Sequence, residues 1–263
     1  MNINRLVSVL IVASLSLAAP VYAVRNYSCN FETQAERDRW VLNPAANSSV
    51  LSKLKNKWYI GAPGNNDRNG QYGLFISDDN GQSAHYTNTA GCWVYAYDTI
   101  SLEAMNGDYT VYFDYCVMAN MASKFDGLYM LWIPESVKIM SIPSSPGKAE
   151  DIPEECLPYF IPLQPLANTD YLSGTATWKQ CAAKIPGSKC DGTPHRLVFI
   201  WTNGSSVPQQ PGAMIDNIVI TDVPLCDAPT NPVIARSGDT VKISWSGNAS
   251  SYEVSAYSYD ADS

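Results

Sequence analysis

Hydrophobic and polar residues alternate with a period of two in short segments along most of the chain from residue 58 onward. The clearest segment carries five large side chains on one face, namely Tyr109, Val111, Phe113, Tyr115 and Val117. A period of two is typical of β-strands, whose successive side chains point to opposite faces. Further strands are expected at residues 58–60, 72–77, 99–102, 128–133, 196–201 and 214–219. Many short strands separated by turn residues predict a β-sandwich.

One short helix is expected within this β pattern, at residues 33–40. Thr33 and Glu36 form a Thr-x-x-Glu capping box, in which each side chain satisfies a backbone N–H at the start of a helix. No other segment shows a comparable helix signal, so the fold class is all-β.

Residues 134–175 depart from the strand pattern. Seven of the 17 prolines lie between Pro134 and Pro165. Proline has no N–H to donate to a β-ladder, so this stretch cannot form a central strand. We expect a long loop or insertion lying over the sandwich, either as a plain surface segment or as a carrier of function.

Composition narrows the class of protein further. The chain of 263 residues is 46% hydrophobic and only 16% charged, which excludes a disordered chain. Its net charge is −8. Nucleic-acid binding usually requires a basic face, so a nucleic-acid partner is not expected.

The first 23 residues have the features of a secretory signal peptide. Arg5 supplies the positive charge, residues 6–19 form an apolar run, and Val21-Tyr22-Ala23 resembles a cleavage site. Cleavage after Ala23 would remove one base and no acid, which takes the net charge from −8 to −9. No later stretch is long and apolar enough to predict a transmembrane helix. The sequence therefore predicts a protein that is secreted or held at the cell surface.

All seven cysteines follow the predicted leader, and export permits disulfides. Cys181 and Cys190 flank a Pro-Gly turn and would clip that loop, whereas Cys29 and Cys226 would tie the two ends of the domain together. The connectivity cannot be deduced from the sequence, and several buried free thiols are an equally open alternative.

A domain boundary is expected after residue 224. A Pro-rich linker at residues 226–232 precedes two alternating segments, residues 240–245 and 251–257. Trp245 in the first segment and a Tyr-x-Val in the second resemble the start of a fibronectin type III domain. Such a domain needs about 100 residues. Residues 227–263 would therefore be an incomplete module, and further domains of the same protein are expected downstream.

The long domain resembles MAM domains and their bacterial relatives, the choice-of-anchor J and cleaved-adhesin modules of Bacteroidota. Cys29-Asn30-Phe31-Glu32 is similar to their opening segment, and residues 213–220, which contain Ile-Asp-Asn-Ile, are similar to their closing strand. Residues 73–81, and the hairpin region 107–128, match internal segments in the same order. The Pro-rich insertion and the cysteine pattern are departures from the family.

The resemblance implies a concanavalin A-like jelly roll over residues 25–224, with a role in adhesion or binding. It also implies a structural calcium ion held by Glu32 and Asp216 near the chain ends. Asp78 and Asp79, in an Asp-Asp-Asn-Gly turn, would add oxygen ligands of the kind calcium prefers. A simple hairpin turn is the alternative interpretation of those two residues.

Carbohydrate recognition often uses exposed aromatic rings that stack on a sugar. Trp58 and Tyr59 precede a Gly-Ala-Pro-Gly turn and are the pair that we expect to be exposed. The other tryptophans lie in strand or helix contexts, where core packing is expected. A protein ligand bound through the loops is the alternative.

No known catalytic motif is present. The two histidines, His85 and His195, belong to no zinc-protease motif, and no Gly-x-Ser-x-Gly occurs. A glycosidase would need two carboxylates facing one cleft. Glu103, Asp114 and Asp126 are candidates, but no spacing singles out a pair.

These observations predict a non-catalytic, secreted or cell-surface adhesion or ligand-binding module of a larger multidomain protein. Its partner would be an extracellular glycan or protein, and calcium would stabilise it. The alternatives are a glycoside hydrolase, or a carbohydrate-binding accessory domain of a secreted hydrolase whose catalytic part lies beyond Ser263. A purely structural spacer is a third.

Overall fold

The computed structural model describes most of the region expected to form the sandwich, together with one hairpin beyond it. The described residues are 23–44, 52, 54–63, 70–88, 92–118, 127–137, 139, 154–163, 172, 175–204, 208–222, 230–237 and 240–246. The predicted leader and residues 251–257 lie outside them.

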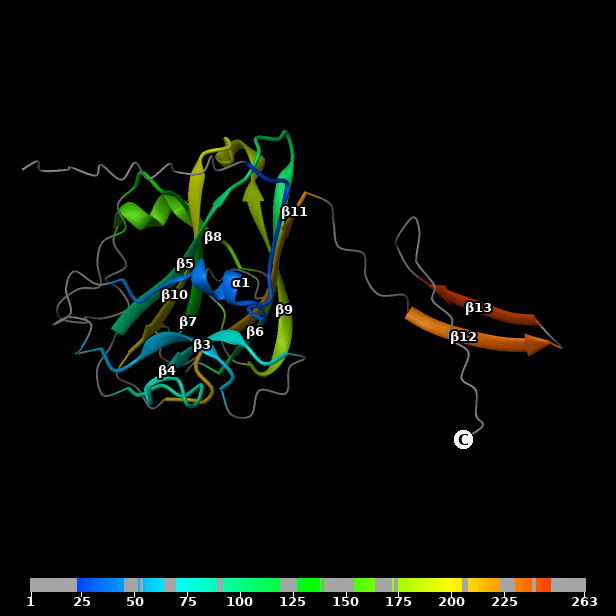
Figure 1. Ribbon diagram of the computed structural model, residues 1–263, viewed down its shortest axis with the longest axis horizontal. Coiled ribbons are helices and arrows are strands. Elements are labelled where there is room, and N and C mark those ends of the chain that lie inside the picture. Colours follow the sequence, from blue (N-terminus) through cyan, green and yellow to red (C-terminus); the bar gives the residue numbers. More distant parts are fainter. Residues whose placement is uncertain are drawn as a thin grey trace, which may run out of the picture.

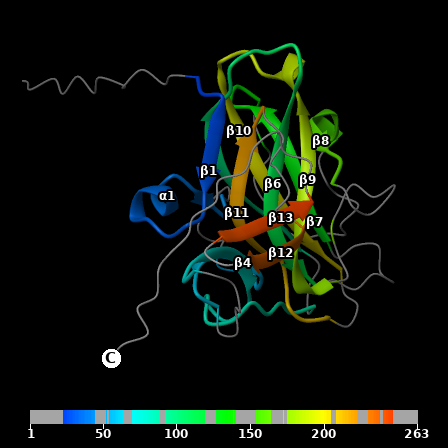
Figure 2. The same cartoon turned by 90° about the vertical axis from the view of Figure 1, so that its right-hand side faces the viewer.

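Two antiparallel sheets pack face to face and form a β-sandwich (Figure 1). The first sheet has the order β3-β4-β11-β6-β9, with β1 also paired to β11. Its strands are β1 (Asn26–Cys29), β3 (Lys57–Gly61), β4 (Gly73–Ser77), β6 (Asp108–Val117), β9 (Thr175–Pro186) and β11 (Met214–Thr221). Figure 2 shows β1, β11, β6 and β9 side by side.

The second sheet has five strands in the order β2-β5-β10-β7-β8. Its strands are β2 (Val41–Leu42), β5 (Cys92–Ser101), β7 (Gly127–Pro134), β8 (Phe160–Ile161) and β10 (Pro194–Asn203). The described part of the domain also contains the short helices α1 (Gln34–Asp38), η2 (Glu154–Tyr159) and η3 (Gly187–Lys189). The predicted β-sandwich is confirmed, and β9 is a long edge strand that the sequence pattern did not single out.

Aromatic side chains from both sheets fill the space between them. The Phe199 ring of β10 lies 5.2 Å from the Phe113 ring of β6 and 6.1 Å from the Trp40 ring. All five large side chains expected on one face of β6 are buried. Burying each of them stabilises the fold by roughly 1.5–3 kcal/mol relative to an exposed position.

The outer face of the five-stranded sheet is also buried at its central strands. Val198 and Ile200 on β10 point away from Phe199, and both are about 1% exposed, as is Leu131 on β7. Cys156 in η2, from the Pro-rich insertion, belongs to the same core cluster as these residues. β8, also from the insertion, pairs with β7 as an edge strand of this sheet, and its Phe160 ring packs on Tyr129. That the insertion as a whole lies over the sandwich stays a prediction.

The N-terminal segment is fixed to the sandwich by a cluster around Asp98 of β5. The Asp98 carboxylate is almost fully buried and accepts hydrogen bonds from the Tyr27 hydroxyl at 2.8 Å and from Arg39 Nε at 3.0 Å. Arg39 also lies over the Tyr27 ring. Helix α1 between them has the expected capping box of Thr33 and Glu36.

Beyond the sandwich, β12 (Thr230–Ser237) and β13 (Thr240–Ser246) form a two-stranded antiparallel hairpin. The hairpin pairs with no other described strand. β13 coincides with the predicted strand at residues 240–245. β12 begins within residues 226–232, which we had expected to be entirely linker.

Replacing Arg39 with Met tests the Asp98 cluster. Burial raises the pKa of Asp98, and the hydrogen bonds from Tyr27 and Arg39 oppose that rise. Asp98 is therefore most favourable to folding when protonated, below its ordinary pKa of 3.8, and less favourable as the pH rises through the folded pKa. Without Arg39 the ionised form of Asp98 is less stable in the folded protein, so we expect Arg39→Met to lower the free energy of unfolding by about 2 kcal/mol at pH 7. The expected loss is moderate for a buried ion pair because Arg39 itself is partly exposed.

The loss should shrink as the pH is lowered toward the point where Asp98 is protonated, as measured by urea unfolding. Arg25→Met is the matched control. It breaks an exposed ion pair with Glu103 and should cost less than about 1 kcal/mol. Equal losses for the two variants at pH 7 would contradict the assigned role of Asp98.

Candidate functional site

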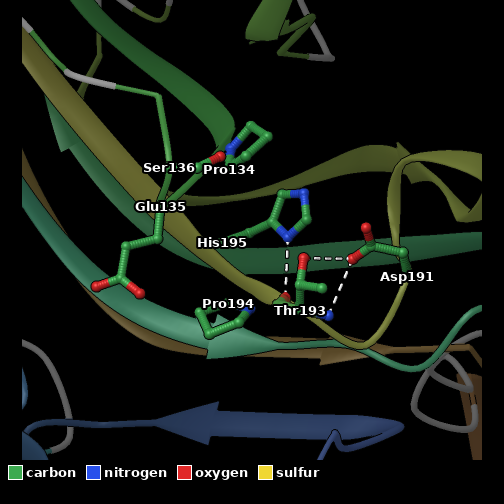
Figure 3. Close-up of a pocket in the computed structure, with 7 residues that line it drawn as sticks. All are labelled: Pro134, Glu135, Ser136, Asp191, Thr193, Pro194 and His195. Carbon is green, nitrogen blue, oxygen red and sulfur yellow. Dashed lines mark hydrogen bonds between the residues drawn. The ribbon is translucent and has the colours of Figure 1, made fainter.

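A pocket of about 660 Å³ lies at one end of the five-stranded sheet (Figure 3). It forms where β7 ends and β10 begins, because the register pairs Pro134 directly with His195. The residues that line it come from these two strands and the segments next to them, namely Pro134, Glu135, Ser136, Asp191, Thr193, Pro194 and His195. The lining contains two carboxylates and no lysine or arginine.

His195 is the most buried polar side chain of the pocket, with 6% of its surface exposed. Its ring stacks on the Trp132 indole, with centroids 4.9 Å apart and planes inclined by only 3°. The indole is itself held by a hydrogen bond from Nε1 to the Lys189 carbonyl. This packing fixes the orientation of the imidazole.

The hydrogen bonding of His195 also fixes which ring nitrogen carries the proton. Nδ1 lies 3.0 Å from the Thr193 carbonyl oxygen. Because a carbonyl can only accept, Nδ1 must be the protonated nitrogen, and in the neutral ring Nε2 then carries the free lone pair. Nε2 points away from Thr193 in Figure 3.

The far wall of the pocket is a turn held by Asp191. Its carboxylate accepts hydrogen bonds from the Thr193 N–H at 2.9 Å and from the Thr193 hydroxyl. These bonds lower the pKa of Asp191 below its ordinary value. Gly192 within this turn has φ +80, a conformation that L side chains rarely adopt.

The near wall follows the end of β7. The Glu135 N–H donates to the Pro194 carbonyl at 3.0 Å, which joins the two walls. The side chains of Glu135 and Ser136 are exposed. The sequence analysis did not predict this pocket. The two walls of the pocket correspond to two short segments of the sequence, the Asp-Gly-Thr-Pro-His turn and the Pro-Glu-Ser strand end. Nothing in the sequence indicates that these segments lie side by side.

The predicted aromatic binding pair is wrong for Trp58. Trp58 has no exposed surface, and its indole Nε1 donates to the Val94 carbonyl across the core. Period-two alternation on β3 turns Trp58 inward and leaves Tyr59 on the outer face. Tyr59 is half-buried, and its ring packs on Phe75 and closely over Gly81. It is the member of the pair that remains accessible.

Asp79 is held within its own turn. Its carboxylate accepts hydrogen bonds from the Ser77 and Ser83 hydroxyls and from the backbone N–H of Gln82 and Ser83. Partial burial would raise the pKa of Asp79, but the hydrogen bonds outweigh it and hold the pKa below the ordinary 3.8. Asp78 is exposed. The geometry matches the simple-turn interpretation of this segment.

Glu32 and Asp216 lie on adjoining segments. Glu32 follows β1, which pairs with β11 up to Cys29 opposite Ile218, and Asp216 lies two residues further along β11. Glu32 Oε1 accepts the backbone N–H of Gln71 and Tyr72. Asp216 is 1% exposed.

Asp216 lies directly opposite Asp114 of β6, which is also buried. A bulge follows Asp216, and Asn217 in the left-handed region (φ 50) donates from its side chain to Asp114 Oδ2 at 2.8 Å. Within the described residues, no group of three or more His, Cys, Asp and Glu side chains is arranged to hold a metal ion.

The candidate glycosidase carboxylates do not gather in one cleft. Glu103 is engaged by Arg25 and lies beside the Tyr109 hydroxyl near the start of β6. Asp114 lies five residues further along β6, roughly 17 Å away at 3.4 Å per residue. Asp126 lies outside the described residues.

The structure contradicts the predicted Cys181–Cys190 bridge, since it holds both as buried thiols. Cys181 faces the core from the middle of β9, and the strand continues for five more residues before η3. That distance is roughly 17 Å, far beyond the Cα separation of about 5.5 Å in a disulfide. Burial raises the pKa of Cys181 to about 12 and that of Cys190 to about 11. Cys29 is likewise a buried thiol, and its predicted partner Cys226 lies outside the described residues.

Comparison with known proteins gives only distant structural similarity. No protein-family model and no curated protein matches the chain. Among solved structures, it is similar to the K1 cleaved adhesin domain of Lys-gingipain from Porphyromonas gingivalis W83, with 16% identity and a TM-score of 0.38 over 74% of this chain and 97% of that chain.

It is also similar to TmCBM27, a mannan-recognising carbohydrate-binding module, with 12% identity and a TM-score of 0.31 over 75% of this chain and 98% of that chain. The enzymatically active domain of bacteriophage CBA120 tailspike protein 4 matches with 12% identity and a TM-score of 0.39, over 73% of this chain and 20% of that chain. At these levels no residue role is transferred. None of the helices in the described part of the chain has the length and apolar character needed to cross a membrane.

Asp79→Asn tests the turn assignment. The change removes the charge that orders four hydrogen-bond donors, so we expect a loss of about 1.5 kcal/mol of unfolding free energy at pH 7. Because the folded pKa is lowered, the contribution is present above pH 3.8 and is lost as the pH falls below it. Chemical denaturation at pH 7 and pH 3 measures both effects. Asp78→Asn, one residue away and exposed, should change stability by less than about 0.5 kcal/mol. A larger loss for Asp78→Asn would contradict the assignment.

Proposed function

We propose that this chain is a non-catalytic, extracellular adhesion or ligand-binding module that uses the His195 pocket to hold a glycan or protein ligand. The pocket carries the proposal because it combines a cavity with an oriented, nearly buried imidazole and several polar groups. Sites for small ligands typically offer a few fixed polar groups in a cavity of about 300–1,000 Å³.

The remaining surfaces of the sandwich support this choice. The centre of the five-stranded sheet is buried on both faces, so a ligand cannot lie across its middle strands. The pocket lies at strand ends and the segments next to them, and binding residues commonly lie on such segments when a rigid scaffold holds them.

An extracellular location is supported by the signal-peptide features of residues 1–23. The hairpin β12–β13 is compatible with the start of a fibronectin type III module at residues 227–263, followed by further domains. The module would then present its pocket as one part of a longer surface protein.

Calcium would stabilise the sandwich at Glu32 and Asp216. Asp114 and Asp216 are two buried carboxylates directly opposite each other, and like charges in that position are destabilising unless a cation or a proton offsets them. Carboxylate oxygens are the ligands that calcium prefers. Asp78 and Asp79 are less suited, because Asp79 is already saturated by hydrogen bonds within its turn.

Chelation tests the calcium proposal. Adding EDTA should lower the Tm of the wild-type protein by several degrees, because a ligand that binds only the folded state stabilises it by mass action. Asp216→Asn should remove that difference, whereas Asp78→Asn should keep it. A wild-type Tm that does not change on chelation would overturn the calcium site.

A steric block tests the binding site itself. Ser136→Trp should fill the pocket without disturbing the core, because Ser136 is exposed. We expect this variant to lose at least about tenfold in affinity for the strongest ligand found on glycan and surface-protein arrays. Ala182→Trp, which also replaces a small exposed residue but lies on β9 of the other sheet, is the matched control and should bind as the wild type does. If the two variants bind equally well, the ligand does not use this pocket.

A further inference from the structure

The predicted leader ends where the described fold begins. The cleavage pattern places the scissile bond between Ala23 and Val24. Val24 is also the first described residue that forms a β-bridge, opposite Leu102 just beyond β5. Its N–H donates to the Ser101 carbonyl at 2.8 Å, and its carbonyl accepts the Glu103 N–H at 3.1 Å. The nitrogen of the scissile bond is therefore part of the fold.

The residues on both sides of this bond are held as well. The Ala23 side chain lies beside Gly192, where a Cβ would meet it at 3.6 Å. Arg25 forms ion pairs with Glu103 at 2.8 Å and with Asp222 at 3.4 Å. The ends of a domain are ordered only where contacts of this kind tie them down.

β1 continues the attachment on the other sheet. It pairs with β11 along its whole length, and Figure 2 shows the two strands side by side. Tyr27 within β1 donates its hydroxyl to Asp98, which also holds Arg39. Residues 24–29 are thus attached to both sheets.

This attachment determines when a peptidase can act. The Val24 side chain is 38% exposed, but the backbone is engaged through both its N–H and its carbonyl. A peptidase acts on a segment that is released from such bonds, so cleavage of the attached segment depends on the fraction of molecules in which the segment is open. Before the segment attaches, the same bond is accessible.

We propose that the fold closes this processing site, so that an export peptidase hydrolyses the Ala23–Val24 bond only while residues 24–29 are detached. The reaction consumes one water and leaves a carboxylate on Ala23 of the leader and an ammonium group on Val24. The ammonium keeps an N–H for the Ser101 carbonyl, so the mature chain can form the same contact. Leader removal therefore precedes the attachment of β1. This inference rests on the extracellular location in the proposed function and not on the His195 pocket.

The first test is N-terminal sequencing of the protein recovered outside the cells that export it, which should begin at Val24. The second is the rate at which a detergent-solubilised leader peptidase cleaves the purified full-length precursor. The precursor is supplied either folded or diluted from urea immediately before the assay. The folded precursor should be cleaved at least about tenfold more slowly.

Two variants show whether release of this segment controls the rate. Arg39→Met removes one partner of the Asp98 cluster that holds Tyr27, and should speed cleavage of the folded precursor at least about fivefold. Asp79→Asn, which weakens the turn after β4, is the matched control and should leave the rate at the wild-type value. Both changes lie far in sequence from the scissile bond, so the peptidase meets the same recognition sequence in all three chains.

The outcomes separate failure of this inference from failure of the proposed location. Equal cleavage rates for the folded and the urea-diluted precursor would overturn the closed site and leave the location intact, as would equal rates for the two variants. An exported protein that begins at a different residue would also overturn this inference alone. A protein that stays inside the cells with its leader attached would overturn both.

Discussion

Burial of both faces at the centre of the five-stranded sheet is the constraint on which the functional interpretation depends. Phe199 packs inward against Phe113, while Val198 and Ile200 point outward and share a core cluster with Cys156 of the Pro-rich insertion. A sheet that is apolar on both sides needs a cover on each, and here the first sheet provides one and residues of the insertion contribute to the other. The pocket lies at one end of this sheet, where strand ends and loops are accessible.

The pocket lies at the end of the five-stranded sheet where Pro134 pairs with His195. The same Trp132 ring that belongs to the core also stacks on His195, so the rigidity of the sandwich extends into the pocket. A backbone carbonyl determines the tautomer, and the turn around Asp191 supplies an ordered carboxylate. Preorganised groups of this kind bind a ligand without a large loss of conformational entropy.

Much of the fold was predictable from the sequence because period-two alternation directly reports which side chains face the core. β6 follows that rule in its first half, β10 is instead a continuous apolar run buried on both faces, and the capping box located α1. β9 was missed because only one of its faces is apolar, and its large residues are spread among Thr, Lys and Gln. The expected exposure of Trp58 failed because a turn following a strand says nothing about which face the preceding residue occupies.

The site was less predictable than the fold, because its residues meet only through strand pairing. His195 and Pro134 lie 61 positions apart and become neighbours through the β7–β10 register. The predicted Cys181–Cys190 bridge failed for a related reason, since nearness in sequence is not nearness in space along an extended strand. Turn chemistry, by contrast, is local, and the Asp-Asp-Asn-Gly segment forms a turn held by Asp79, although it connects the two sheets and is not the hairpin turn that we expected.

The central claim is that the Thr193 carbonyl holds a proton on His195 Nδ1 and that Nε2 is directed away from Thr193, where a ligand in the pocket can reach it. Long-range ¹⁵N–¹H correlation NMR of the imidazole ring reports directly whether Nδ1 carries a proton. The structure predicts a protonated Nδ1 and an Nε2 resonance that shifts when the module binds its ligand. A ring protonated at Nε2 and free at Nδ1, or an Nε2 resonance that is indifferent to every ligand of the module, would contradict it.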